Sequence, residues 1–142
     1  MIRAQPLEYG FELNEFDPFF NYRATQFMTE NGLPAYLEWH DDLSWHPYGR
    51  NVSITSQVML HTTATMLYQI FGMGTSLYDF TIWFPVVIGS LTTIVIFALV
   101  RTIGGTTAGL FASLFFAISP IIILRGSIGW FKSEPLGLFY GL

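Results

Sequence analysis

Two long runs without charged residues dominate the second half of the chain. One run of 21 residues lies between Asp79 and Arg101, and another of 23 residues lies between Arg101 and Arg125. Each run is close to the ~20 apolar residues that a helix needs to cross about 30 Å of hydrocarbon. The pattern therefore predicts two membrane-spanning helices, at 79–101 and 106–124, joined by a tight turn at RTIGGTT. Two core segments of a soluble protein are the alternative.

The segments beside these runs are less uniformly apolar. Residues 53–76 carry no Asp, Glu, Lys or Arg, but glutamine, histidine and threonine interrupt apolar positions that fall loosely at helical spacing. This pattern predicts an amphipathic helix that rests at the membrane interface. The last residues, 135–142, resemble the start of a further membrane helix that the sequence does not complete.

Composition supports a membrane protein. Charged residues make up only 11% of the chain and the mean hydropathy is +0.45, whereas soluble domains carry roughly 25% charge. The fold class that we expect is an all-α integral membrane protein. The net charge of −4 is too small and too local to indicate nucleic-acid binding, and the absence of cysteine excludes disulfides and thiolate metal ligands from these residues.

Most of the acidic residues lie before the first apolar run. Residues 1–50 hold eight acids and three bases, so residues 1–52 are predicted to form an acidic, aromatic loop outside the membrane. Two crossings return the chain to the side from which it left. The loop and the short segment 125–134 are therefore expected to face the same side. Asp17 and Glu134, far apart in sequence, can then meet at one surface.

Asp17 is the first candidate for chemistry. It precedes Pro18, which favours an extended backbone at the preceding residue. A carboxylate that projects from an extended segment beside the membrane suits a hard divalent cation such as Mg²⁺ or Mn²⁺, which prefers carboxylate oxygens and substrate phosphates. A solvated charge on a loop is the alternative for each acidic residue in this region.

Two further stretches concentrate polar and aromatic residues. WHDDLSWHPYGR, at 39–50, offers His40, Asp41, Asp42 and His46 for a metal site, but neighbours on one loop rarely converge. We therefore favour aromatic packing and Asp–Arg pairing there, and the role of Arg50 stays open. RGSIGWFKSEP, at 125–135, ends the second run with cations whose simplest role is to extend from the membrane end toward water.

These stretches resemble the catalytic subunit of oligosaccharyltransferase, the membrane enzyme that N-glycosylates asparagine, in its archaeal form. The resemblance is carried by NEFDPFFNYRAT, WHDDLSWHPYGR and ISPIIILRGSIGWFKSEP. It implies a polytopic glycosyltransferase fold of the GT-C type, of which this chain is the N-terminal part. It also implies a multi-pass protein of the cell membrane with its active site on the extracytoplasmic face.

The resemblance assigns roles to individual residues. The first acidic motif of the family falls on Glu15-Phe16-Asp17, which implies that Asp17 binds the divalent metal and contacts the acceptor asparagine. The second falls on 132–134, where Glu134 is the expected metal ligand. Lys132 stands where the family often has aspartate, so its role stays open. Arg125 matches an arginine that the family uses near the reaction centre.

The implied reaction transfers a glycan from a dolichol-type lipid phosphate or pyrophosphate to the asparagine amide of an Asn-x-Ser/Thr sequence, with Mg²⁺ or Mn²⁺ as cofactor. We expect these residues alone to be inactive, because the family's later acidic loop and sequon-reading domain are not among them. One alternative is a non-catalytic membrane subunit that binds a partner through its acidic, aromatic loop. Another is a related glycosyltransferase that uses a lipid-linked sugar and a hydroxyl acceptor.

Overall fold

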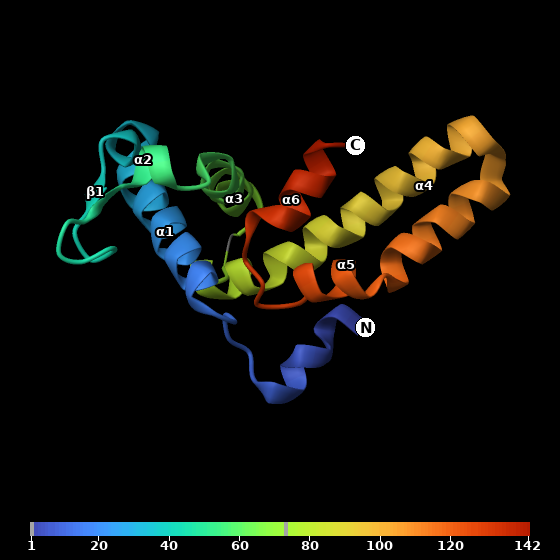
Figure 1. Ribbon diagram of the computed structural model, residues 1–142, viewed down its shortest axis with the longest axis horizontal. Helices are drawn as coiled ribbons and strands as arrows, with labels where there is room; N and C mark the ends of the chain where they lie inside the picture. The colour runs from blue at the N-terminus through green and yellow to red at the C-terminus, as the bar shows by residue number, and fades with distance from the viewer. Residues whose placement is uncertain (1, 73) are drawn as a thin grey trace.

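The computed structural model describes residues 2–72 and 74–142, and most of these residues are helical (Figure 1). The helices are η1 (Ile2–Tyr9), α1 (Phe16–Leu37), α2 (Val52–Thr55), α3 (Val58–Phe71), α4 (Leu77–Ile118), α5 (Pro120–Arg125) and α6 (Ser133–Tyr140). Two short antiparallel strands, β1 (His40–Asp41) and β2 (Arg50–Asn51), close the loop between α1 and α2, with His40 opposite Asn51.

The apolar helix α4 is bent back on itself into a hairpin (Figure 1). Gly105 breaks the helix with φ 83° and ψ 173°, a conformation that glycine adopts without steric cost. In the returning arm, Gly109 packs closely on the first arm, because a Cβ there would lie 2.9 Å from the carbonyl oxygen of Phe97. The returning chain then continues through α5 to Arg125. The two arms correspond to the two apolar runs of the sequence.

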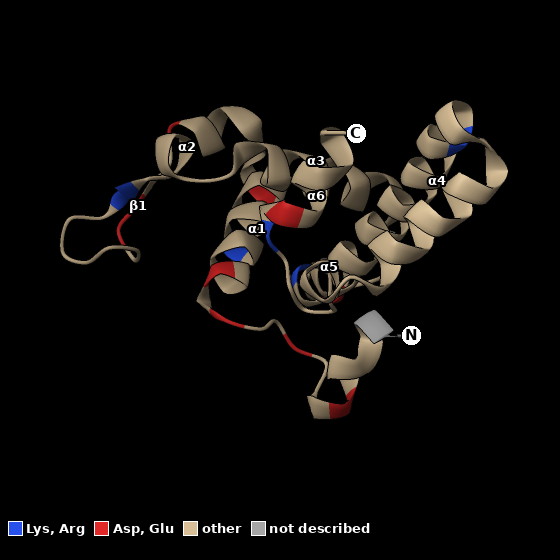
Figure 2. Cartoon of the chain, turned by 45° about the vertical axis from the view of Figure 1, so that its right-hand side comes forward, with Lys and Arg blue, Asp and Glu red and all other residues tan. Residues whose placement is uncertain are grey.

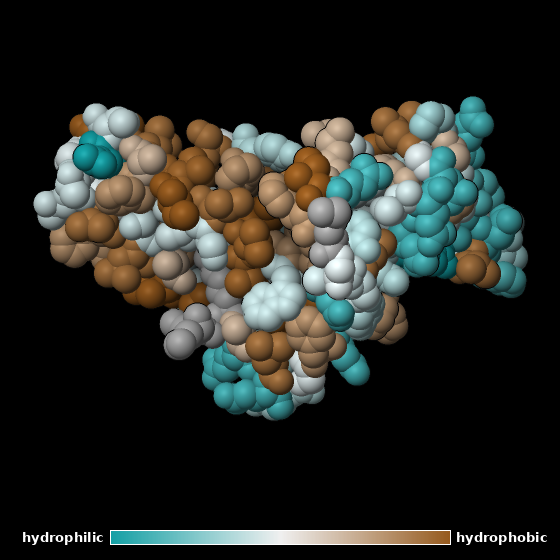
Figure 3. Space-filling model, turned by 180° about the vertical axis from the view of Figure 1, so that it is seen from behind, coloured by the Kyte–Doolittle hydropathy of each residue, from teal (hydrophilic) through white to brown (hydrophobic). Residues whose placement is uncertain are grey.

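By length and composition α4 could cross a membrane. The charged residues of α4 are Asp79 in its first turn and Arg101, and Figure 2 shows blue near the turn of the hairpin. Large apolar side chains are exposed along both arms, among them Ile94, Ile103, Phe111 and Phe115. Hydrophobic residues lie over the hairpin side in Figure 3, and hydrophilic residues gather at the opposite end, where β1 lies. This surface is typical of a hairpin that faces lipid, and the crossing itself stays a prediction.

The other elements pack at the base of the hairpin, where both of its ends lie (Figure 1). One core joins α3, α4, α6 and the segment between α5 and α6, and it includes Leu60, Ile82, Phe84, Ile128 and Phe131. A second core joins α1 to α2 and the residues near the strands, and it includes Ala24, Met28, Tyr36 and Val52. The base is therefore a packed structure that can hold side chains in fixed positions.

Three expectations from the sequence are wrong in detail. Residues 1–52 contain the 22-residue helix α1 instead of forming only a loop. Asp17 is not extended, because it lies in the first turn of α1 with Pro18 beside it. Proline is tolerated in a first turn, where its missing N–H would have no partner inside the helix. The single interfacial helix predicted at 53–76 is divided into α2 and α3, with a break at Ser56 and Gln57.

Candidate functional site

The segment between α5 and α6 is fixed against the chain that precedes α1. The backbone N–H and the side-chain amide of Asn14 donate to the carbonyl oxygens of Gly129 and Ile128, at 3.1 and 3.0 Å. The N–H of Gly129 donates to the carbonyl of Ile82 in α4. Gly129 has φ 77°, and a Cβ there would lie 2.3 Å from the carbonyl oxygen of Glu12. This close approach requires glycine.

A buried hydrogen-bond network ties the same segment to α1 and α3. The side-chain amide of Asn21 donates to the carbonyl oxygen of Phe131 at 2.9 Å. The Oδ1 atom of Asn21 lies 3.2 Å from Nε2 of His61, and Nδ1 of His61 lies 2.6 Å from the hydroxyl of Tyr36. Burial, with a smaller effect of Arg50, lowers the pKa of His61 to about 3. The ring is therefore neutral at physiological pH.

The direction of each bond in this network follows from the chemistry of its groups. The Oδ1 atom of Asn21 can only accept, so Nε2 of the neutral His61 ring carries the proton. Nδ1 then accepts from the hydroxyl of Tyr36, which in turn accepts from Ser56 at 2.6 Å. All polar atoms of the network are paired, and such networks specify one arrangement of the elements that they join.

These anchors bring the two acidic motifs together. Nζ of Lys132, the residue before α6, donates to Oε2 of Glu15 at 2.9 Å and lies 3.0 Å from Oδ2 of Asp17. The Lys132 side chain is 12% exposed, compared with 53% for Glu15 and 74% for Asp17. Burial lowers the pKa of Lys132, but its hydrogen bonds to Glu15 and Asp17 raise it, and the net shift is upward. The ammonium therefore stays charged.

The convergence of Glu15 and Asp17 needs an irregular backbone. Residues two apart on a helix do not face each other, so a regular helix would direct these carboxylates apart. Glu15 precedes α1 and has φ 69° and ψ 174°. A positive φ is uncommon for a residue other than glycine, and strained residues of this kind cluster at functional sites. The backbone at Glu15 is what lets both carboxylates reach one ammonium.

Arg125, at the end of α5, holds the second acidic motif. Its Nη1 atom donates to Oε1 of Glu134 at 3.1 Å. The guanidinium also lies over the ring of Trp130, 5.2 Å from its centre, and Nζ of Lys132 lies 4.4 Å from the same centre. Cations are attracted to the faces of aromatic rings. Trp130 therefore contacts both cations of the cluster.

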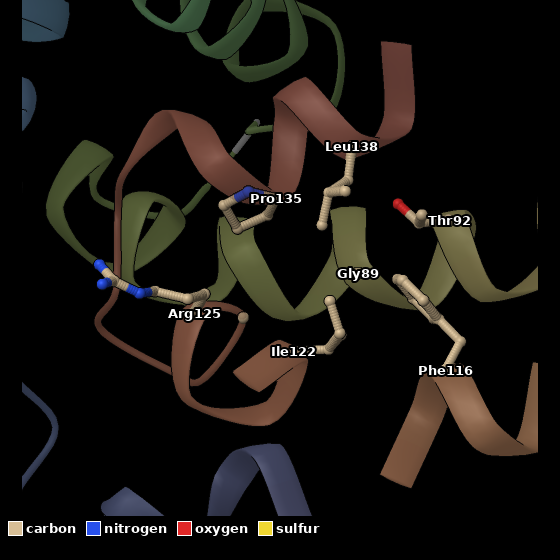
Figure 4. Close-up of a pocket in the computed structure, with 8 residues that line it drawn as sticks. Gly89, Thr92, Phe116, Ile122, Arg125, Pro135 and Leu138 are labelled. Atoms are coloured by element: carbon tan, nitrogen blue, oxygen red, sulfur yellow. The ribbon is translucent and has the colours of Figure 1, made fainter. Parts of the chain in front are cut away.

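The stem of Arg125 borders a small cavity between α4, α5 and α6. Gly89 and Thr92 of α4 and Pro135 and Leu138 of α6 line it. Figure 4 shows the guanidinium extending away from these residues, toward the segment between α5 and α6. The apolar packing of the stem thus leaves the charged end free to pair with Glu134.

The structure thus contains two ion-pair groups that both contact Trp130: Lys132 with Glu15 and Asp17, and Arg125 with Glu134. We call these five charged residues the ion-pair cluster, and it includes the predicted residues Asp17, Arg125, Lys132 and Glu134. The guanidinium of Arg50 lies over the ring of Phe20, 3.9 Å from its centre, and it donates hydrogen bonds to Thr55.

In the loop at 39–50, Asp41 pairs with Arg23, as expected for a structural role. His40 bonds to Asn51 across the strands. Within the described residues there is no group of three or more His, Cys, Asp or Glu residues that could hold a metal ion.

Sequence reasoning missed Asn21, His61 and Gly129. His61 and the polar residues around it in 53–76 were interpreted as interruptions of an interfacial helix. A histidine that lies among apolar residues on the face of a helix is a signal for a buried polar contact. Gly129 gives a weaker signal in the sequence. The need for glycine becomes clear only from its close approach to the backbone of Glu12, which is distant in sequence.

The arrangement does not fit a divalent cation shared by Asp17 and Glu134. The Lys132 ammonium fills the position between Glu15 and Asp17, and Arg125 takes one oxygen of Glu134. Oε2 of Glu134 is buried without a hydrogen-bond partner among the described residues, but it offers only one ligand. Hard cations need about six oxygen ligands, some of them from water or substrate. The metal site therefore stays a prediction.

Comparison with known proteins identifies the family. Residues 7–141 match the family model described as oligosaccharyl transferase STT3, N-terminal. Similar curated proteins are dolichyl-diphosphooligosaccharide–protein glycosyltransferase subunits. Subunit stt-3 of Caenorhabditis elegans is 32% identical over 130 residues, which are 89% of this chain and 17% of the relative. Subunit STT3B of Arabidopsis thaliana is 32% identical over 136 residues, 94% of this chain and 18% of the relative.

Subunit STT3 of Saccharomyces cerevisiae is 30% identical over 130 residues, 89% of this chain and 18% of the relative. The chain thus spans less than a fifth of the length of these relatives. They are eukaryotic, so the archaeal form stays a prediction. Because the family match includes both acidic motifs and the hairpin between them, the chain belongs to the oligosaccharyl transferase STT3 family, in its N-terminal region.

Proposed function

We propose that this chain is the N-terminal part of an oligosaccharyltransferase catalytic subunit. The enzyme transfers a glycan from a dolichol-type lipid phosphate or pyrophosphate to the side-chain amide of asparagine in Asn-x-Ser/Thr sequences. One observation carries the proposal: the acidic motif at the start of α1 and the residues 125–134 meet in one cluster at the base of an apolar hairpin. The family match and the names of the relatives support the reaction class.

Asp17 is proposed to bind the acceptor. The lone pair of an amide nitrogen is delocalised into its carbonyl, so the nitrogen is a poor nucleophile. A carboxylate that accepts hydrogen bonds from the amide NH₂ orients the nitrogen and favours the twisted form in which the lone pair is available. Asp17 suits this role because its side chain is 74% exposed while Lys132 fixes one of its oxygens.

Arg125 is proposed to stabilise the leaving phosphate. Its side chain is 49% exposed at the end of α5, next to the apolar arms through which a lipid-linked donor would approach. The planar guanidinium can donate two parallel hydrogen bonds to a phosphate, and it offsets charge that develops in the transition state. Glu134 and Trp130 hold the guanidinium in place before the donor arrives. A lipid-linked donor also explains why the site lies at a membrane surface.

The location follows from the same arrangement. We propose a multi-pass protein of the cell membrane with a polytopic GT-C fold, in which α4 contacts lipid and the ion-pair cluster lies on the extracytoplasmic face. The acceptor polypeptide would reach the cluster from water. The archaeal form of the enzyme belongs to the same proposal. The proposed roles of Asp17 and Arg125 need no Mg²⁺ or Mn²⁺, and Lys132 and Arg125 already pair with the predicted metal ligands.

The test is glycan transfer by the complete transferase to an Asn-x-Thr peptide. Asp17→Asn should lower kcat by about 100-fold or more, because it removes the carboxylate that orients the amide. Asp42→Asn is the matched control. Asp42 is also an exposed acid in this region, but it lies outside the ion-pair cluster, so its variant should keep wild-type kcat.

Three results would contradict the proposal. One is near-normal transfer by an Asp17→Asn variant whose unfolding temperature equals that of the wild type. This result would show that Asp17 has no role in the reaction. Transfer to a peptide in which glutamine replaces the acceptor asparagine would favour the hydroxyl-acceptor glycosyltransferase. Absence of transfer by the complete wild-type protein would favour the non-catalytic subunit.

A further inference from the structure

Lys132 is the residue of the cluster whose role the family resemblance leaves open. Its ammonium lies within 3.0 Å of one oxygen of Glu15 and one of Asp17, and it lies over the ring of Trp130. An ammonium has three donors and no acceptor. Two of the donors therefore have carboxylate partners, and the ammonium also lies near the face of the Trp130 ring.

This geometry differs from that of a lysine that extends into water. A lysine at a membrane end ordinarily keeps its stem along apolar surface and its charge in solvent. The Lys132 side chain is only 12% exposed, and its charge is directed at two carboxylates from another part of the chain. Its backbone is also fixed, because its N–H donates to the carbonyl of Trp130 and Asn21 binds the carbonyl of Phe131.

We infer that the Lys132 ammonium is the resident cation of the first acidic motif and takes the position that a divalent metal ion would need between Glu15 and Asp17. The inference rests on the proposed function for the roles of the two motifs. Lys132 is a positioning residue in this account: it offsets the repulsion between the two carboxylates and fixes one oxygen of Asp17, which leaves the other oxygen to meet the acceptor.

The charges of the cluster agree with this role. Glu15, Asp17 and Glu134 carry three negative charges, and Lys132 and Arg125 carry two positive charges, so the cluster is near neutrality without a metal. A divalent ion would compete with the ammonium for the same oxygens, because both bind carboxylates directly. Binding of Mg²⁺ or Mn²⁺ to Asp17 would therefore require displacement of Lys132, and removal of Lys132 should improve binding.

The experiment is a Mn²⁺ titration of the purified complete protein in detergent, with free Mn²⁺ measured by electron paramagnetic resonance. The single variant Asp17→Asn, which keeps Lys132, should bind Mn²⁺ with the same affinity as the wild type. Lys132→Asp should tighten binding by about tenfold or more, since it removes the competing charge and adds a ligand. Asp17→Asn should cancel that gain in the double variant. Lys132→Arg, which keeps a cation, is the control and should bind as the wild type does.

Two outcomes would overturn the inference. One is a Mn²⁺ affinity of the Asp17→Asn single variant that is lower than that of the wild type. The other is a Lys132→Asp variant that binds Mn²⁺ no more tightly than the wild type. The first requires no change at Lys132, so it remains decisive if the Lys132 variants fail to fold. Both readouts measure binding without transfer, so the inference can fail while the proposed function stands, and the proposed function can fail while the inference stands.

Discussion

At the scale of single residues, glycine and a strained glutamate determine where the ion-pair cluster lies. Gly129 allows the backbone of the segment between α5 and α6 to touch the backbone at Glu12. Glu15, with its positive φ, turns its carboxylate toward the same ammonium that binds Asp17. Neither residue is proposed to react, but both position side chains that have proposed roles in transfer.

Gly129→Ala tests this placement. The new Cβ would lie 2.3 Å from the carbonyl oxygen of Glu12 and would strain a backbone at φ 77°, so the segment must move. We expect a loss of stability of about 1–3 kcal/mol, measured by thermal unfolding, and a lower kcat. Gly137→Ala is the matched control, because its Cβ would meet no atom within 4 Å and alanine favours the helix α6. Equal stability of the two variants would contradict the close packing described for Gly129.

At the scale of elements, the buried network of Asn21, His61 and Tyr36 holds α1 and α3 against the segment that carries Lys132. The pKa of His61 falls from its ordinary value of 6.5 to about 3 in the folded protein. Below pH 6.5 the unfolded state therefore binds a proton that the folded state does not bind. The stability that the neutral ring contributes is complete above pH 6.5 and is lost as the pH falls toward 3.

His61→Gln should reveal this dependence. We expect the variant to be less stable than the wild type at pH 7.5. The difference in the free energy of unfolding should shrink by up to about 1.4 kcal/mol for each pH unit below 6.5. Denaturant unfolding between pH 7.5 and 4.5 measures it, with His46→Gln, on the exposed loop, as the control. A difference that is constant with pH would show that His61 is not held neutral.

The elements differ in how far the sequence predicts them. The hairpin follows from two uncharged runs and a pair of glycines, and both signals are local. Helix α1 was missed because Asp17-Pro18 favours an extended backbone and because its aromatic residues mark no single face. The contacts of Lys132 could not be predicted at all. They depend on the backbone at Glu15 and on anchors between residues more than 100 positions apart, which no local pattern contains.

At the scale of the whole molecule, the hairpin separates two environments. Its arms expose apolar side chains, and the turn carries a single charged residue, Arg101. The acidic motifs, the cations that bind them and the strands all lie at or beyond the other end (Figures 1 and 2). The central claim is that two crossings deliver both motifs to one face of the membrane, where a lipid-linked donor and a water-soluble acceptor can meet.

Single-cysteine labelling tests this claim most directly, because these 142 residues contain no native cysteine. Asp42→Cys, Ser133→Cys and Thr102→Cys are placed one at a time in the complete protein, with any other cysteine removed, and sealed vesicles are treated with a membrane-impermeant maleimide. We predict that positions 42 and 133 react from the extracytoplasmic side and that position 102, near the turn, reacts only from the opposite side. Labelling of positions 42 and 133 from different sides, or of position 102 from the same side as both, would contradict the account.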